Sequence, residues 1–108
     1  MDIGQVIGKL IKQKKLTQLE VAERIGKSPT ALSQIIKGVY KPNPDTLEKI
    51  CNVLEIPQPI LYFLTISEKD IPEDKIELYK LLAPALRDFV YRIFGDEVNV
   101  LEQNINAN

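Results

Sequence analysis

Side chains that can form hydrogen bonds recur at helical spacing in the stretch GKSPTALSQIIKG, residues 26–38. On a helix that turns by about 100° per residue, Thr30, Ser33, Gln34 and Lys37 share one arc. This arc carries three hydrogen-bonding side chains and one cation, with no acidic and no bulky apolar residue. The edges of DNA bases in the major groove are read by short donors and acceptors of this kind. The arc therefore predicts a base-reading surface, and an ordinary solvated helix face is the alternative interpretation.

The sequence around this arc predicts how it is positioned. Ser28 followed by Pro29 is typical of a helix start, and the upstream run Thr17-Gln18-Leu19-Glu20 forms a capping box that begins another helix. Gly26 ends that upstream helix, so only two residues separate it from Ser28. A connection this short forces a sharp crossing, in which the second helix protrudes. This is the geometry of the helix-turn-helix motif.

Helical periodicity accounts for the rest of the chain, and no convincing run of alternating strand residues occurs. The spacing predicts further helices over residues 3–14, 43–54, 60–64 and 73–94, with a polar linker over residues 65–74. Pro84 is expected to kink or split the last helix. The sequence therefore predicts an all-α protein, with one domain in residues 1–65 and a linker plus a C-terminal helical segment in residues 66–108.

The segment LTQLEVAERIGKSPTALSQIIKGVYKPNPDTLEKICNVLEIP resembles the Cro/repressor class of helix-turn-helix proteins, the XRE family. The family pattern spans roughly residues 3–64. It is matched at Leu16, Thr17, Gln18, Val21, Ala22, Ile25, Gly26, Ser28, Leu32, Ser33, Ile35 and Gly38, and again at Pro42, Thr46, Leu47, Lys49 and Ile50. The resemblance implies a five-helix lambda-repressor-like domain with an additional C-terminal helical segment.

The resemblance also implies roles for individual residues in binding double-stranded DNA. Thr30, Ser33 and Gln34 match base-facing positions, while Gln18 matches a glutamine that packs on the phosphate backbone. The positions implied to contact DNA are Gln18, Ser28, Pro29, Thr30, Ser33, Gln34, Lys37, Tyr40 and Lys41. Pro29 departs from the family, since many members carry Arg or Gln there and proline has no side-chain donor. Lys15 and Glu55 stand where a helix-ending glycine is frequent, so we expect those helix ends to be shaped differently.

Charge and apolar patterning separate the two halves of the chain. Residues 1–50 carry nine Lys/Arg against five Asp/Glu, and residues 51–108 carry five against ten. This indicates that only the first half meets a polyanion. In the second half, an apolar stripe too large for solvent predicts a homodimer interface, with folding back onto the first domain as the alternative. The stripe residues are Tyr79, Leu82, Leu86, Phe89, Val90 and Ile93.

Several classes of function are disfavoured by composition. The chain has no histidine, which argues against imidazole chemistry and the usual zinc sites, and its one cysteine, Cys51, excludes an internal disulfide. Cys51 lies on an apolar helix face and is expected to be buried. With no glycine-rich phosphate loop and no clustered paired carboxylates, we expect neither an enzyme nor a cofactor. No apolar stretch approaches the roughly 18 residues of a membrane span. The single cysteine fits a reducing cytoplasm, and with DNA as the expected partner we expect a cytoplasmic, nucleoid-associated protein.

Taken together, these patterns predict a sequence-specific transcriptional regulator. We expect a repressor from a prokaryote, phage or mobile element that binds DNA as a homodimer. Two alternatives stay open. One is the antitoxin of a toxin–antitoxin pair, whose C-terminal segment grips a protein partner, and the sequence does not separate it from a regulator. The other is a protein–protein adaptor that has lost DNA binding, which acidic or bulky apolar residues on the outer face of residues 28–38 would indicate.

Overall fold

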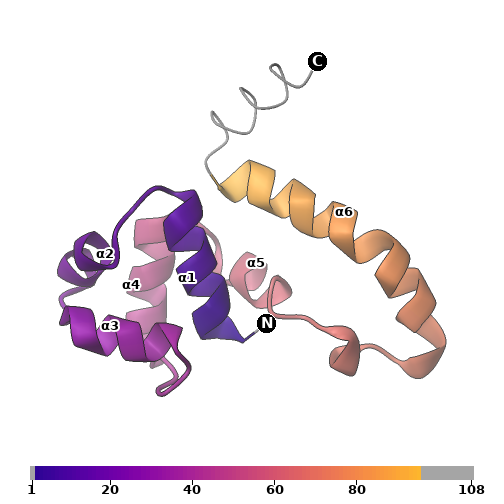
Figure 1. Cartoon of the computed structure of the whole chain (residues 1–108), viewed down its shortest axis with the longest axis horizontal. Coiled ribbons are helices and arrows are strands. Elements are labelled where there is room, and N and C mark those ends of the chain that lie inside the picture. Colours follow the sequence, from indigo (N-terminus) through magenta and orange to yellow (C-terminus); the bar gives the residue numbers. More distant parts are fainter. Residues whose placement is uncertain (1, 96–108) are drawn as a thin grey trace, which may run out of the picture. The chain divides into compact units, whose positions relative to one another are not determined.

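A computed structural model describes residues 2–95 of the chain, which divides into two compact units between Thr65 and Ile66. The described residues form helices and no strand, which confirms the all-α class (Figure 1). The first unit holds α1 (Ile3–Gln13), α2 (Gln18–Ile25), α3 (Pro29–Ile36), α4 (Pro44–Leu54) and α5 (Gln58–Phe63). The second holds two short 3-10 turns, η1 (Glu68–Asp70) and η2 (Glu73–Lys75), and then α6 (Ile76–Phe94).

The first four helices begin at side-chain caps, three of which the sequence predicts. The hydroxyl of Thr17 accepts a hydrogen bond from the Glu20 amide at 3.0 Å, and the Glu20 carboxylate accepts one from the Thr17 amide in return. Ser28 caps α3 and Asn43 caps α4 in the same way. A second capping box, formed by Asp2 and Gln5 at the start of α1, is not among those predictions. Local hydrogen bonding therefore defines where each helix starts.

The same four helices end in one shared motif. In each case a residue in the left-handed region follows the helix, at Lys15, Gly26, Gly38 and Glu55. The next amide then reaches back to a carbonyl five residues earlier, in the pairs Leu16–Ile11, Lys27–Ala22, Val39–Gln34 and Ile56–Cys51, at 2.9–3.1 Å. The expectation that the ends at Lys15 and Glu55 are shaped differently is therefore wrong. Both non-glycine residues adopt the conformation that glycine takes at the other two ends.

The core of the first unit is built from the apolar faces of its five helices. Its largest fully buried side chains include Ile7, Leu10, Leu32, Ile50, Leu54 and Leu61. Cys51 is also buried, with 4% of its surface exposed, which confirms the expectation for this residue. Burial raises the pKa of the Cys51 thiol. The thiol is therefore part of the packed interior.

Helices α1 and α3 approach one another closely at two glycines of α1. A Cβ atom at Gly4 would overlap the backbone carbonyl oxygen of Ile35 and would lie 2.8 Å from that of Ile36. A Cβ atom at Gly8 would lie 3.0 Å from the Cγ2 methyl of Ile36. The absence of side chains at Gly4 and Gly8 therefore allows the start of α1 to pack on the last turn of α3.

The second unit consists of the turns η1 and η2 followed by α6. The carbonyl oxygen of Ile66 accepts hydrogen bonds from the Tyr79 hydroxyl, at 3.0 Å, and from Nη2 of Arg87. Nη2 of Arg87 also donates to the Tyr79 hydroxyl at 2.8 Å. Pro84 lies inside α6, which bends but stays continuous (Figure 1). Of the two outcomes expected at Pro84, a kink or a split, the structure shows the kink.

Candidate nucleic-acid interface

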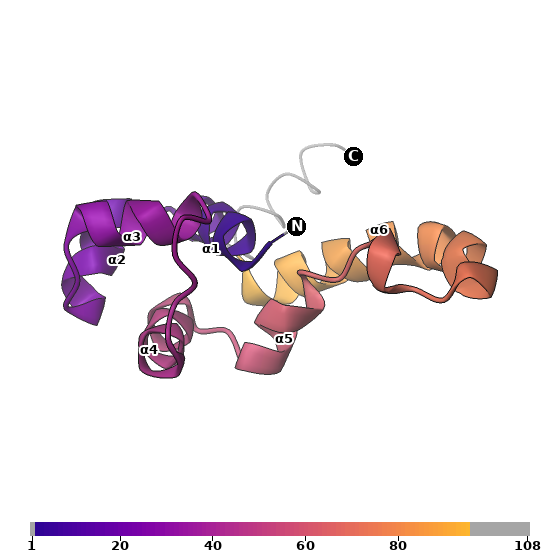
Figure 2. The same ribbon diagram turned by 90° about the horizontal axis from the view of Figure 1, so that it is seen from below.

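Helix α3 lies along the edge of the first unit and is packed on one side only. Its buried residues, Leu32 and Ile35, face inward, and the helix contacts both α1 and α2. Figure 2 shows α3 running horizontally while α4 is seen end-on, so the two helices cross steeply. The opposite side of α3 carries the polar arc. The structure therefore positions this helix as the predicted motif requires, with one face anchored and one face open.

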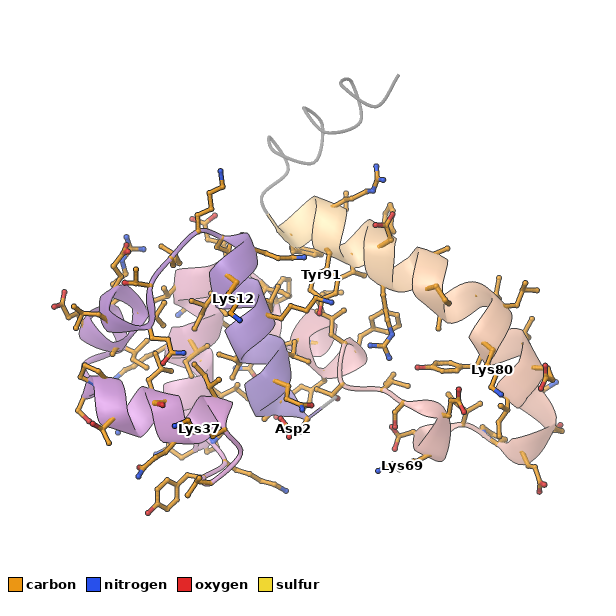
Figure 3. The ribbon with its side chains drawn as sticks, in the orientation of Figure 1. Asp2, Lys12, Lys37, Lys69, Lys80 and Tyr91 are labelled. Atoms are coloured by element: carbon orange, nitrogen blue, oxygen red, sulfur yellow. The ribbon has the colours of Figure 1, made fainter. Side chains whose placement is uncertain are left out.

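The four residues of the predicted arc lie on this outer side with graded exposure. Thr30 and Lys37 are exposed, whereas Ser33 and Gln34 are half-buried. Lys37 marks the end of α3 in Figure 3. Half-burial restricts the rotamers of Ser33 and Gln34, so a contact with a base edge would cost them less conformational entropy. The arc thus has two half-buried hydrogen-bonding side chains, Ser33 and Gln34, at its centre and an exposed residue toward each end.

The start of α3 is used for helix capping. The Ser28 hydroxyl accepts the amide of Ala31 at 3.1 Å, and Pro29 occupies the first helical position, where its missing N–H costs nothing. Both residues are exposed. Ser28 and Pro29 therefore lie at the proposed surface, but the oxygen of Ser28 already has a partner and Pro29 offers no donor.

The remaining predicted contacts lie before and after α3 along the chain. Gln18 is the first residue of α2 and is exposed. Tyr40 and Lys41 lie in the loop after α3 and are exposed as well, with 59% of the Tyr40 surface accessible. Their neighbour Val39 is 60% exposed and is absent from the predicted set, because an apolar loop residue gives no signal of binding. Phosphates on either side of a groove could be contacted by such flanking groups.

The exposed face of α6 differs from the stripe that periodicity predicts. Leu82, Leu86, Phe89 and Ile93 are each 47–61% exposed, and Leu78 and Leu81 join them at 53% and 74%. Tyr79 is half-buried and its hydroxyl bonds to the Ile66 carbonyl, while Val90 is buried. On the helix, the six exposed residues fall on one continuous side, at spacings of three and four. We call this the α6 apolar face.

The described residues provide neither a metal-binding cluster nor a membrane-spanning helix. Within residues 2–95, no group of three or more His, Cys, Asp or Glu side chains could hold a metal ion. No helix in this part of the chain is both long enough and apolar enough to cross a membrane.

Comparison with known proteins supports the motif. The sequence model of the helix-turn-helix family matches residues 7–57. The immunity repressor protein of Bacillus phage phi105 is 38% identical over 56 residues, which cover 52% of this chain and 39% of the phage protein. No solved structure matches the chain.

Two cyanate hydratases are similar over more of the chain at lower identity. The protein of Aquifex aeolicus is 25% identical over 111 residues, covering 90% of this chain and 74% of its own length. That of Pseudomonas putida is 27% identical over 96 residues, covering 80% and 66%. The similarity to these proteins therefore extends beyond the first unit.

Proposed function

We propose that this chain is a Cro/repressor-type helix-turn-helix protein of the XRE family and a homodimeric repressor of transcription, since its residues 7–57 match the helix-turn-helix family. One observation carries the proposal. The outer side of α3 presents Thr30, Ser33, Gln34 and Lys37 without an acidic side chain among them, inside the segment that matches the family. A helix placed this way enters the major groove of double-stranded DNA.

The side chains of α3 divide into base-reading and backbone-binding groups. The Gln34 amide suits bidentate pairing with adenine, and the Thr30 methyl suits contact with the methyl of thymine. Contacts with DNA phosphates are assigned to Lys37, Tyr40 and Lys41, which come next along the chain. Gln18 is assigned the same role, because the free backbone amides at the start of α2 add positive potential there. In this arrangement α3 supplies sequence preference, and the flanking groups supply affinity and register.

Repression is the mode of regulation that the comparisons favour. The phage relative is named an immunity repressor, and its similarity covers 52% of this chain. A repressor works by occupying its operator, which requires DNA binding and no further activity. We place its action in the cytoplasm, at the nucleoid. The adaptor alternative is less supported, because the outer side of α3 has neither acidic nor bulky apolar residues.

Homodimerisation would supply the selectivity that a single α3 lacks. One helix reads few base pairs, and each good bidentate contact contributes about 1–3 kcal/mol of discrimination. A two-fold dimer reads two half-sites and doubles the contacts. The α6 apolar face suits this role, since six large exposed side chains on one helix are a large area to leave in water. Leu82, Leu86, Phe89 and Ile93 follow 4-3-4 spacing, which is typical of paired helices.

Selection of binding sites from random duplex DNA tests the base-reading role. We expect a defined motif for the wild-type protein and a relaxed motif for Gln34→Ala, because the adenine contact is lost at one position. Lys37→Gln should instead weaken all sequences about equally and reduce the salt dependence of binding. Recovery of no motif at any salt concentration would favour the adaptor, and an unchanged motif for Gln34→Ala would remove Gln34 from the reading surface.

Sedimentation equilibrium tests the dimer. We expect Leu86→Glu and Phe89→Glu to convert a dimer at tens of micromolar into a monomer, since each places a charge in the α6 apolar face. Lys80→Glu changes a charge on the opposite side of α6 and serves as the control. A wild-type monomer at these concentrations would contradict homodimerisation. Dimers that survive both substitutions would locate the interface elsewhere and favour a folded-back second unit.

The similarity to the cyanate hydratases reaches into the second unit and raises the question whether this chain also acts on cyanate. We propose that this chain is not an enzyme. Its sequence identity to those proteins is 25–27%, and its sequence contains no histidine and no clustered pair of carboxylates. Incubation of the purified protein with cyanate, followed by measurement of cyanate loss, decides the matter. Turnover above that of a heat-denatured sample would overturn the proposal.

A further inference from the structure

Two side chains of α6 hold the carbonyl oxygen of Ile66, the first residue of the second unit. The Tyr79 hydroxyl donates to this oxygen at 3.0 Å, and Nη2 of Arg87 donates to it as well. Nη2 of Arg87 also donates to the Tyr79 hydroxyl at 2.8 Å, so the three groups form a closed triangle of hydrogen bonds. All three residues are half-buried, and hydrogen bonds are stronger in such surroundings than in water. We call this arrangement the Ile66 clamp.

The clamp closes a long segment of the chain onto α6. Tyr79 lies 13 residues after Ile66, and Arg87 lies 21 residues after it. The turns η1 and η2 fill the segment before α6, and the Ser67 amide donates to the Asp70 carboxylate at 2.9 Å at the start of η1. The segment is therefore folded locally as well as fastened at its first residue.

The first unit is anchored at its own last residue. The amide of Thr65 donates to the Tyr62 carbonyl at 3.0 Å, and the Thr65 hydroxyl donates to the same oxygen at 2.6 Å. The preceding residue, Leu64, is fully buried, and its amide donates to the Ile60 carbonyl at 3.1 Å. Hydrogen bonds therefore continue from α5 to the last residue of the first unit.

The connection between the two anchored residues is very short. The peptide bond that joins Thr65 to Ile66 is planar, so the chain turns there only about ψ of Thr65 and φ of Ile66. If the clamp released Ile66 and the turns unfolded, residues 66–75 would form a flexible linker between the first unit and α6. A flexible linker of about ten residues has a root-mean-square span of about 16–19 Å. The clamp therefore replaces a long tether by a short one.

We propose that the Ile66 clamp sets the spacing of the two DNA half-sites that the homodimer recognises, with Tyr79 and Arg87 as positioning residues. The proposal rests on the proposed function and deepens it. In that function the two protomers pair through the α6 apolar face, and Arg87 directly follows Leu86 of this face. The clamp thus ties the start of the second unit to the helix that pairs. It limits how far each first unit can move within the dimer.

The geometry of DNA makes this limit selective. One base pair added between two half-sites moves one of them by about 3.4 Å along the helix axis and turns it by about 35° around the axis. A free linker with a span of about 16–19 Å would follow a shift of several base pairs. A connection with few free torsions cannot follow it. The clamped homodimer therefore binds both half-sites only at one spacing and its nearest neighbours.

Duplexes with two half-sites at varied spacing test this proposal. The half-site is the motif that the wild-type protein selects, and the dissociation constant is measured at each spacing. We expect the wild-type affinity to fall about 100-fold when the spacing changes by two base pairs, because one half-site is then lost. Tyr79→Phe combined with Arg87→Met removes the donors and keeps the bulk of both side chains. This double variant should lose less than about tenfold, because a longer tether still spans the sites.

Three further proteins complete the test. Arg92→Met is the matched control, since Nε of Arg92 bonds to the Asp88 carboxylate at 2.9 Å, outside the clamp, and its spacing profile should equal the wild-type profile. Arg87→Lys keeps a cationic donor and should give a narrower profile than Arg87→Met. A single half-site should bind the wild-type protein and the double variant equally, because α3 is unchanged. The single variant Arg87→Met decides the comparison if the double variant fails to dimerise.

The outcomes separate this proposal from the proposed function. A wild-type spacing profile in a clamp variant that is still a dimer overturns the clamp proposal alone. A wild-type protein that binds one half-site as tightly as two overturns the homodimeric reading of DNA, and the clamp proposal with it. A broad profile in the wild-type protein itself, with two half-sites still preferred over one, also overturns the clamp proposal and leaves the homodimer in place.

Discussion

Gly4 of α1 lies directly against the backbone carbonyl of Ile35 in the last turn of α3. A Cβ atom at Gly4 would overlap that oxygen and would also lie 2.8 Å from the carbonyl oxygen of Ile36. Backbone atoms of a packed helix cannot rotate away as a side chain can. The contact therefore joins the start of α1, where free amides carry partial positive charge, to the end of α3, where free carbonyls carry partial negative charge. It fixes the position of α3 in the first unit.

Gly4→Ala is expected to separate α1 from α3. The added methyl group meets two backbone oxygens, so we expect the free energy of unfolding to fall by about 1–3 kcal/mol, as in other overpacked interiors. DNA affinity should fall as well, because α3 shifts relative to Gln18. Denaturant titration measures the first effect and a duplex binding assay the second.

Gly8→Ala is the matched control on the same helix. Its methyl group would meet only the Cγ2 atom of Ile36, at 3.0 Å, and that side chain can adjust. Alanine is also favoured over glycine inside a helix by about 1 kcal/mol. We therefore expect a stability equal to or above that of the wild-type protein. Equal stabilities for the two alanine variants would show that the Gly4 contact does not constrain the packing.

The helix starts could be predicted from the sequence because their causes are local. Thr17, Ser28 and Asn43 each bond to an amide three residues ahead, so sequence spacing contains the whole interaction. The polar arc of α3 was likewise visible, since helical geometry alone places its members on one side. These predictions needed no knowledge of how the helices pack.

The features that sequence analysis missed depend on distant contacts. The role of Gly8 appears only when Ile36 of another helix lies beside it. Periodicity placed Tyr79 with the exposed leucines of α6, but its hydroxyl bonds to the carbonyl of Ile66, which lies 13 residues earlier in the chain. The expectation for the helix ends at Lys15 and Glu55 is wrong for a related reason. A local preference worth about 1 kcal/mol was outweighed by the packing and hydrogen bonds around those ends.

Glu55→Gly is expected to stabilise the first unit. Glu55 has φ 56°, in a region that costs a residue with a Cβ atom about 1 kcal/mol relative to glycine. The hydrogen bond from the Ile56 amide to the Cys51 carbonyl should remain, so the free energy of unfolding should rise by up to about 1 kcal/mol. Thermal and urea unfolding report the change. Gly26→Ala, at φ 72°, makes the opposite replacement and should lower stability; a loss of stability in Glu55→Gly would show that its side chain contributes more than its strain costs.

Tyr79→Phe is expected to lower the local stability of the second unit around η1 without affecting self-association. The variant loses the hydrogen bond to the Ile66 carbonyl, a net loss of about 1 kcal/mol, although Arg87 still donates to that oxygen. Amide exchange should therefore become faster in η1, where the Asp70 amide bonds to the Ser67 carbonyl. Sedimentation should stay unchanged, because Tyr79 lies outside the α6 apolar face. A weakened dimer would return Tyr79 to the interface.

Cys51 is expected to make the first unit less stable at alkaline pH. Burial raises the pKa of its thiol in the folded protein above the ordinary value of 9.0. Above that value the unfolded chain loses a proton that the folded protein retains, so the free energy of unfolding falls as pH rises, by up to about 1.4 kcal/mol per pH unit. Cys51→Ala removes this thiol, and its unfolding free energy should depend less steeply on pH between about 8 and 10. The comparison uses slopes, since the alanine variant is also destabilised by the cavity it creates. Identical slopes for the two proteins would show that Cys51 ionises as readily in the folded state as in the unfolded chain.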